Sequence, residues 1–288
     1  MTTPLIHTFK HHAMATEFQV RIADQDATEA GQAAVELFSL VDRLQDLLSR
    51  FRDHSEISQI AALEPGQALP LNEMTYDCLR LAQEVEERTC GAFNITATAK
   101  RAPDALRPSW RLEQENSLIY CEEGRLEFDL GAIGKGFALD RMAEELAVWE
   151  FGAYLLIAGG SSVLAGAAPA GTGGWDAGLG LPGGGARRFA LTHSSLGGSG
   201  IFEQGRHIMD PRTGQPAQVR ERAWAFSKQA ALSDAFSTAA MVLNDSELHA
   251  TLSGYTEACV VLADGGEWRT HGDYPLPPEI PAAPRASS

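Results

Sequence analysis

The amino-acid sequence predicts an α+β fold, and three observations support this prediction. Helical spacing of apolar residues dominates the first half of the chain, and strand-like patterns dominate the second half. The glycine-rich residues 166–187 belong to the second half and include a candidate strand over 175–181. A doubly wound α/β sheet would instead alternate strands and helices along the whole chain. With 288 residues, 44% of them hydrophobic, the chain is long enough for one large domain or two small ones.

The elements of the first half are predicted from periodicity. Residues 17–23 alternate apolar and polar side chains, which is typical of a half-buried strand. Apolar residues recur at helical spacing between Ala27 and Arg50, which predicts a long amphipathic helix. Similar patterns predict a helix over 73–89, a strand over 124–131 and a helix over 137–149.

Short apolar runs predict the elements of the second half. Residues 153–158 are almost all apolar, which favours a buried strand. The proline-rich residues 273–288 cannot build a core, so we expect one domain over 1–272 followed by a flexible tail. The remaining predictions are strands over 175–181, 187–192, 222–227 and 256–262, and a helix over 234–243.

Charge and cysteine content exclude several classes of protein. The 23 Lys and Arg residues against 38 Asp and Glu residues give a net charge of −15, so the chain lacks the basic field of a nucleic-acid binder. Its four cysteines form no C-x-x-C pair, which argues against a zinc site and against a disulfide framework. No membrane span and no signal peptide are recognised. We therefore expect a cytoplasmic protein.

The stretch DLGAIGKGFALD, residues 129–140, has the features of an anion-binding loop. It fits neither the G-x-x-x-x-G-K-[ST] pattern nor the G-x-G-x-x-G pattern of known phosphate loops. Its glycines nevertheless let backbone N–H groups approach an anion, it opens a predicted helix, and Lys135 adds a cation. The alternative is a tight turn into a helix with a surface lysine.

The stretch ALSDAFSTAAMVL, residues 231–243, places Asp234 and Thr238 one helical turn apart on one face. A carboxylate and a hydroxyl, with a nearby carbonyl, suit a hard cation such as Mg²⁺. The alternative is that Ser233 or Asp234 only caps the helix, because both residue types are common at that position.

The stretch RHIMDPRTGQP, residues 206–216, contains the turn signature DPRTG. His207 lies just ahead of this turn, either as a functional group or as an incidental residue. The preceding small residues 194–200, SSLGGSG, are predicted to form a loop that a ligand could approach closely.

These three segments, in this order, resemble the ApbE family, the FAD:protein FMN transferases. The family carries a D-L-x-x-I-x-K-G loop, an S-G followed by H-x-x-D-P-x-T-G, and a late D-x-x-S-T helix. The matching residues are DLGAIGKG at 129–136, SG at 199–200, HIMDPRTG at 207–214 and DAFST at 234–238. Weaker likenesses are MAT at 14–16, LSRFRDHSEISQI at 48–60, GAFNIT at 91–96 and AGGSS at 158–162.

The resemblance implies a single T-fold-like domain with helices packed on an antiparallel sheet. It also implies transfer of FMN from FAD to a Thr or Ser hydroxyl of an acceptor flavoprotein, with release of AMP. His207 would stand beside the reacting phosphate as the base, with Lys135 and Asp234 as further catalytic groups. The implied Mg²⁺ ligands are Asp234, Thr238 and the carbonyl of Ala132. The implied FAD contacts are Met14, Ala92, Phe93, Asn94, Asp129, Lys135 and Ile208.

The chain departs from the family pattern in three places. The aspartate of G-x-F-D-I-T is Asn94, the acidic-aromatic pair after S-G is Ile201-Phe202, and the stretch over 97–128 is short. A non-catalytic or FAD-hydrolysing flavin-binding protein is therefore a second hypothesis. An interaction protein with an empty site is a third. Family members are often exported, which is the alternative to the cytoplasm.

Overall fold

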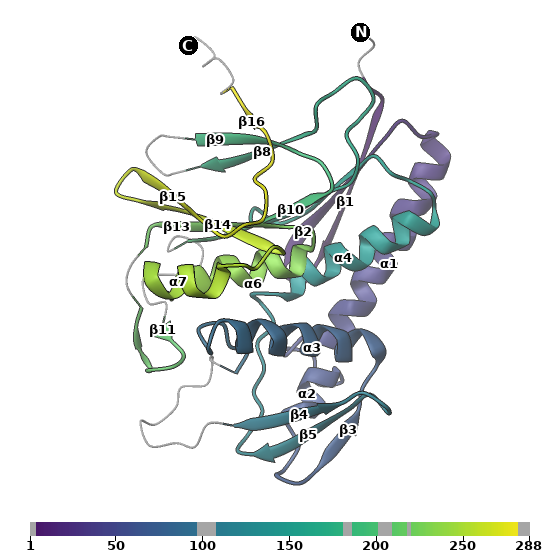
Figure 1. Cartoon of the computed structure of the whole chain (residues 1–288). Coiled ribbons are helices and arrows are strands. Elements are labelled where there is room, and N and C mark those ends of the chain that lie inside the picture. Colours follow the sequence, from purple (N-terminus) through teal and green to yellow (C-terminus); the bar gives the residue numbers. More distant parts are fainter. Residues whose placement is uncertain (1–3, 97–107, 181–185, 201–208, 218–219, 282–288) are drawn as a thin grey trace.

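The computed structural model describes residues 4–96, 108–180, 186–200, 209–217 and 220–281. Its centre is an eight-stranded antiparallel sheet in the order β1-β2-β6-β7-β10-β13-β14-β15 (Figure 1). The strands are β1 (Ile6–Ala13), β2 (Thr16–Ala23), β6 (Tyr154–Ala158), β7 (Ser162–Ala165), β10 (Ser194–Gly200), β13 (Arg222–Ser227), β14 (Ala258–Asp264) and β15 (Glu267–His271).

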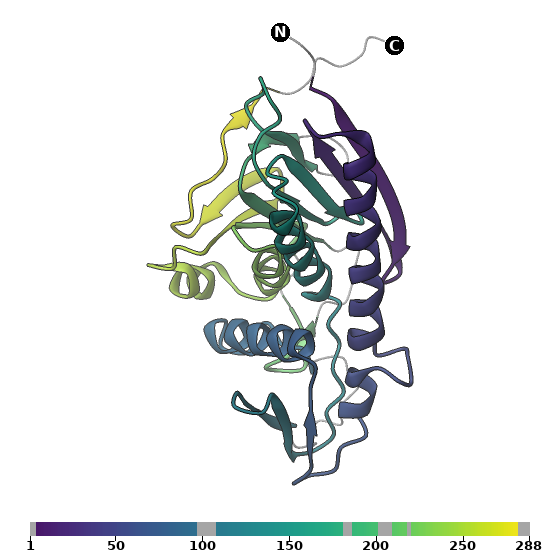
Figure 2. The same cartoon turned by 90° about the vertical axis from the view of Figure 1, so that its right-hand side faces the viewer.

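Three helices cover one face of this sheet: α1 (Ala27–Leu48), α4 (Gly134–Val148) and α6 (Ala230–Ala240). Figure 2 shows them side by side in front of the strands. The strands divide their side chains between the two faces with period two. In β13, Ala223 and Ala225 belong to the core under the helices, whereas Trp224 and Phe226 belong to a second core on the opposite face. The small residues on the helix side let α6 lie close to the sheet.

A smaller antiparallel sheet covers the opposite face. It consists of β8 (Trp175–Gly180), β9 (Ala186–Leu191) and β16 (Glu279–Ile280), in the order β16-β9-β8. Trp175, Leu179 and Phe189 from this sheet pack against the central sheet in the second core. The helices and the small sheet therefore bury both faces of the central strands.

The remaining elements lie beyond the helices, at the end of the molecule away from the β8–β9–β16 sheet (Figure 1). There α3 contacts α6 and α1, and the order of the third sheet is β3-β5-β4. These elements are α2 (Glu56–Ile60), α3 (Glu73–Arg88), β3 (Ala68–Pro70), β4 (Ser109–Glu113) and β5 (Leu118–Glu123). Two further strands, β11 (Met209–Asp210) and β12 (Gln215–Pro216), form a hairpin, and α7 (Asp245–Leu252) follows α6.

The α+β fold class is confirmed, and most of the predicted elements are present. Two of the predicted elements differ from the structure. Residues 126–130 alternate buried and half-buried side chains, as a strand does, but they pair with no strand in the described part of the chain. Residues 194–200 are not a loop: they form β10, a central strand whose Gly197 lies against α6. A Cβ at Gly197 would lie 2.4 Å from the Ser233 carbonyl carbon, so glycine is required by packing.

The flexible tail predicted from residue 273 is also corrected. Tyr274 is buried in the second core, and its hydroxyl donates to the Ser194 hydroxyl over 3.2 Å. Strand β16 pairs with β9 through Glu279 and Ile280. One aromatic anchor and a two-residue strand are enough to attach a proline-rich segment that has no core of its own. Residues 282–288 lie outside the described part of the chain.

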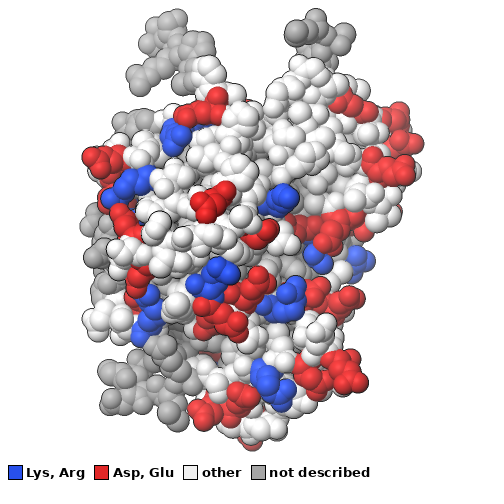
Figure 3. Space-filling view, in the orientation of Figure 1, with Lys and Arg blue, Asp and Glu red and all other residues white. Residues whose placement is uncertain are grey.

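Acidic and basic side chains are interspersed over the surface shown in Figure 3, and no broad basic patch crosses that face. This agrees with the acidic net charge. None of the helices in the described part of the chain has the length and apolar character needed to cross a bilayer.

Candidate active site

The site is built where the first turn of α4 crosses α6. Gly136 makes this crossing possible, because a Cβ there would lie 2.2 Å from the carbonyl oxygen of Ala230. Since no side chain fits in that space, the two backbones touch. The loop of residues 129–136 and the helix that carries Asp234 are therefore in contact, although they are far apart in sequence.

Asp234 is the buried acid at this crossing, with 5% of its surface exposed. Its Oδ2 accepts from the backbone N–H of Gly136 at 2.8 Å and from the Ser162 hydroxyl at 3.0 Å. Its Oδ1 accepts no hydrogen bond from any described residue. Burial raises the pKa of Asp234 to about 6, partly offset by the nearby charge of Lys135 and by the two hydrogen bonds. The carboxylate thus keeps one oxygen available for a cation.

The other two predicted metal ligands, the carbonyl of Ala132 and the hydroxyl of Thr238, also offer oxygen atoms. In a regular helix the Gly136 N–H would bond to the Ala132 carbonyl, but here it bonds to Asp234, and no described group donates to that carbonyl. The Thr238 hydroxyl lies one turn after Asp234, 3.2 Å from the Ser199 hydroxyl. No three His, Cys, Asp or Glu side chains gather as a metal site among the residues described. The donor set nevertheless fits Mg²⁺, which commonly uses one or two carboxylates together with water and substrate phosphates.

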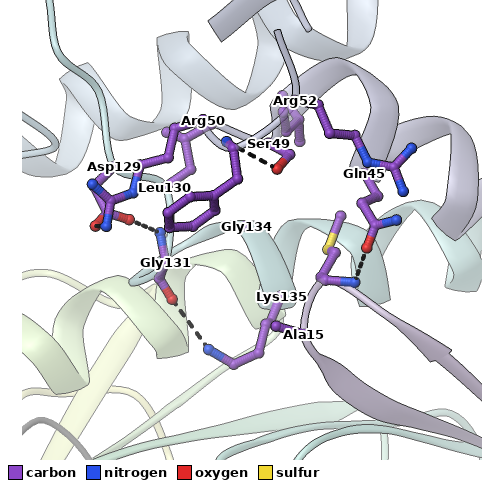
Figure 4. A pocket seen from close by; sticks show the side chains of 13 residues that line it. Ala15, Gln45, Ser49, Arg50, Arg52, Asp129, Leu130, Gly131, Gly134 and Lys135 are labelled. Carbon is purple, nitrogen blue, oxygen red and sulfur yellow. Dashed lines mark hydrogen bonds and ion pairs between the residues drawn. The ribbon is translucent and has the colours of Figure 1, made fainter. Parts of the chain in front are cut away.

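A pocket of about 460 Å³ opens beside the same loop (Figure 4). Three of the residues predicted to contact FAD, Met14, Asp129 and Lys135, line it together. The ammonium of Lys135 donates to the Gly131 carbonyl at 3.1 Å, and Figure 4 shows its stem lying along the loop. Lys135 therefore belongs to both parts of the site, the pocket and the environment of Asp234.

The rim of the pocket includes two arginines that the sequence prediction missed. Arg50 forms an ion pair with Asp129 at 3.2 Å and lies over the ring of Phe51, which is 81% exposed. Arg52 and Gln45 also line the pocket. Two arginines beside an exposed aromatic ring could have been noticed in LSRFRDHS, but the spacing alone does not place them near Lys135.

The remaining predicted FAD contacts either do not line this pocket or lie outside the described residues. Ala92 and Phe93 are buried in the core, and neither they nor Asn94 line the pocket. Asn94 donates to Glu86 at 2.6 Å and accepts from the N–H and hydroxyl of Thr96, so its side chain organises its own loop. Contact of this segment with FAD stays a prediction.

His207 and Ile208 lie outside the described residues. The turn that follows them is described. Asp210 accepts from the backbone N–H of Arg212 at 2.8 Å, and its carbonyl accepts from Gly214. Asp210 therefore caps the predicted DPRTG turn.

The predicted start of the Asp234 helix is wrong. The helix begins at Ala230, so Ser233 lies inside it and donates to the Ala230 carbonyl. The N-cap residue, Gln229, makes no side-chain cap. Asp140 of α4 takes that role by accepting from the N–H groups of Ala230 and Ala231 at 2.7 and 2.9 Å. Sequence reasoning missed Asp140, because it gives no local signal of a partner on another element. Ser162 belongs to the AGGSS likeness, but its bond to Asp234 was not predicted.

Comparison with known proteins shows the family to which the chain belongs. The model of the ApbE family matches residues 14–261. An FAD:protein FMN transferase of Treponema pallidum is 26% identical, over 87% of this chain and 80% of that protein, and one of Klebsiella pneumoniae is 21% identical, over 75% of each. Among solved structures, the apo flavinyl transferase ApbE of Pseudomonas stutzeri has a TM-score of 0.76 at 21% identity, covering 93% of this chain and 94% of that chain.

The ApbE protein of Thermotoga maritima gives a TM-score of 0.78 at 21% identity, covering 93% of this chain and 97% of that one. These likenesses to solved structures show that the fold is shared. The family match covers most of the chain and includes the lysine loop, the crossing helix and the pocket. The chain belongs to the ApbE family.

Proposed function

We propose that this protein is an FAD:protein FMN transferase. It moves FMN from FAD to a Thr or Ser hydroxyl of an acceptor flavoprotein, and AMP leaves. The observation that carries the proposal is the contact between Gly136 and Asp234, because it joins a lysine-bearing loop to a buried carboxylate beside a pocket. The names of the relatives support the same reaction.

The chain's own groups supply positioning and positive charge for a pyrophosphate. Phosphoryl transfer needs little else from a protein, since its transition state is stabilised mainly by alignment and electrostatics. The positive end of the α4 helix dipole and the ammonium of Lys135 act on the phosphate oxygens. Such local devices are required because a protein with a net charge of −15 repels a dianion at long range.

Asp234, Thr238 and the Ala132 carbonyl would hold Mg²⁺, which when bound neutralises charge on the phosphate oxygens. The role of the protein is to keep the Asp234 carboxylate ionised and oriented toward the cation. The hydrogen bonds from Gly136 and Ser162 do both, because they stabilise the charged form and fix Oδ2.

The transfer step forms a bond from the acceptor oxygen to the FMN phosphorus and breaks the bond from that phosphorus to the bridging oxygen of AMP. The acceptor hydroxyl loses a proton, so a base is required. His207 is proposed for this role because histidine titrates near neutrality and because of its place in the family motif. A His207→Ala variant that binds FAD and transfers FMN at the wild-type rate would contradict this role.

Mass spectrometry of an acceptor flavoprotein tests the proposal. The acceptor is incubated with this protein, FAD and Mg²⁺, and AMP is measured in the same sample. The proposal predicts AMP release together with an acceptor mass gain of one FMN residue on a Thr or Ser. AMP and free FMN without a mass gain would indicate FAD hydrolysis, and neither product would indicate a binding protein. Both outcomes would contradict transfer.

A further inference from the structure

Helix α6 has an unusual amino end. Its N-cap residue, Gln229, makes no capping hydrogen bond with its side chain. Two N–H groups of the first turn, which have no acceptor within their own helix, are instead satisfied from another helix: the carboxylate oxygens of Asp140 accept from Ala230 and Ala231 at 2.7 and 2.9 Å. A carboxylate at a helix amino end is favoured by the helix dipole as well as by these bonds.

The two helices exchange hydrogen bonds in both directions. Gly136 at the start of α4 donates to Asp234, and Asp140, one turn later in α4, accepts from Ala230 and Ala231, one turn before Asp234. Residues four apart lie on one face of a helix, so both exchanges occur along a single seam. Sliding or rotation of α6 against α4 would break both exchanges at once.

We propose that Asp140 is a positioning residue for the Asp234 carboxylate. It holds the first turn of α6 against α4 so that Oδ1 of Asp234 is presented to the divalent cation. This inference rests on the metal site of the proposed function. Asp140 acts through α6 and touches neither cation nor substrate.

The rest of α6 is fixed independently of Asp140. Ala235, Phe236 and Ala239 are fully buried in the core under the central sheet. Loss of the Asp140 bonds should therefore leave α6 folded and displace mainly its first turn. A displacement of about 1 Å in such a site can lower function by about 10²-fold, so a modest shift is measurable.

The test measures Mn²⁺ binding to the full chain, with and without FAD, by electron paramagnetic resonance of the free ion. Asp140→Asn keeps the side-chain shape but places an amide N–H where one oxygen accepted a hydrogen bond. Glu144→Gln is the matched control, since it removes an exposed carboxylate of α4 that pairs with Arg141. Circular dichroism and FAD affinity are measured for each protein.

Asp140→Asn is expected to weaken Mn²⁺ binding about 10-fold or more and to raise the half-saturating Mg²⁺ for AMP release in proportion, with FAD affinity unchanged. Glu144→Gln should match the wild type. If Asp140→Asn does not fold, Asp140→Glu, which keeps the charge but displaces it, should show the same loss to a smaller degree.

Mn²⁺ affinity equal to the wild type in the folded variant overturns the inference and leaves the proposed function intact. A wild-type chain that binds no Mn²⁺ in the presence of FAD overturns the metal site itself, and the inference with it. The wild-type measurement thus separates the two failures.

Discussion

The backbone N–H of Gly136 donates to Oδ2 of Asp234 over 2.8 Å, although 98 positions separate the two residues in the chain. This bond joins the amino end of α4 to the middle of α6. A second bond from Ser162, on the adjacent strand β7, reaches the same oxygen. One oxygen of a buried carboxylate is thereby occupied from two elements, and the other is left for a ligand.

Removal of the Asp234 carboxylate should abolish metal-dependent turnover. Asp234→Ala is expected to lower AMP release from FAD by at least about 100-fold, because a metal supplies several kcal/mol of charge stabilisation. FAD binding should persist, since Asp234 is not among the residues that line the pocket. Asp264→Ala is the control, because it removes a half-exposed carboxylate of β14. Full turnover by Asp234→Ala would remove the metal assignment.

Ser162 should influence the metal more than its neighbour Ser161 does. Ser162→Ala removes a hydrogen bond to a charged group, so the half-saturating Mg²⁺ should rise about 10-fold. The Ser161 hydroxyl lies 3.4 Å from the Ser162 hydroxyl and does not bond to Asp234. Ser161→Ala should therefore change the half-saturating Mg²⁺ concentration by less than about twofold. Ser162→Thr retains the hydroxyl and should restore most of the affinity. Equal effects of the two alanine variants would argue against this assignment.

The backbone contact at Gly136 should make any larger residue costly. Gly136→Ala places a methyl group 2.2 Å from the Ala230 oxygen, so the helices must separate, and the free energy of unfolding should fall by about 1–3 kcal/mol or more. Gly134→Ala is the matched control two residues earlier, because its Cβ would meet only an ordinary contact at 3.7 Å. Urea denaturation compares the two variants. Comparable stability of both would show that the helices can separate freely.

The metal-free protein should become less stable as the pH rises toward neutrality. Burial raises the pKa of Asp234 to about 6 and that of Asp140 to about 7, above the ordinary value of 3.8. Between about pH 4 and pH 7 the folded state therefore holds more protons than the unfolded chain. The stability contributed by these raised pKa values is complete below pH 4 and is lost as the pH passes through them.

Urea unfolding in EDTA at pH 5 and pH 8 checks this sign. The comparison is with a variant carrying both Asp140→Asn and Asp234→Asn, in which neither group titrates. The wild type should lose more stability than this variant between the two pH values. Other acids with lowered pKa values, such as Glu247 and Asp245, are already ionised across the window and cancel in the comparison. A smaller loss of stability in the wild type than in the double variant would contradict the predicted pH dependence.

The elements with a strong local pattern could be predicted from the sequence. The long helix α1 begins at Ala27, as its apolar spacing predicts, and α3 ends within one residue of its predicted end. Residues 126–130 show the limit of such patterns. Their alternation correctly predicts which side chains are buried, but these residues pair with no strand in the described part of the chain. Likewise, the glycines of β10 resemble a loop in sequence, although in the structure they allow α6 to approach.

The site was predictable where the motif itself carries the chemistry, and not where geometry does. The loop itself indicates Lys135, the family resemblance implies Asp129, and both line the pocket. Asp140 and Ser162 act through partners 90 and 72 positions away, and a single sequence gives no signal of such a contact. The helix start was misplaced for the same reason, since the cap of α6 comes from α4 and not from Ser233.

We propose above that a divalent cation binds where α4 crosses α6. Anomalous diffraction from a crystal of the protein grown with FAD and Mn²⁺ tests it most directly. We expect one anomalous peak for a Mn²⁺ ion that is coordinated by Asp234, with the Ala132 carbonyl and the Thr238 hydroxyl as its other protein ligands. A crystal that contains bound FAD but shows its Mn²⁺ elsewhere, or shows none, would contradict the account.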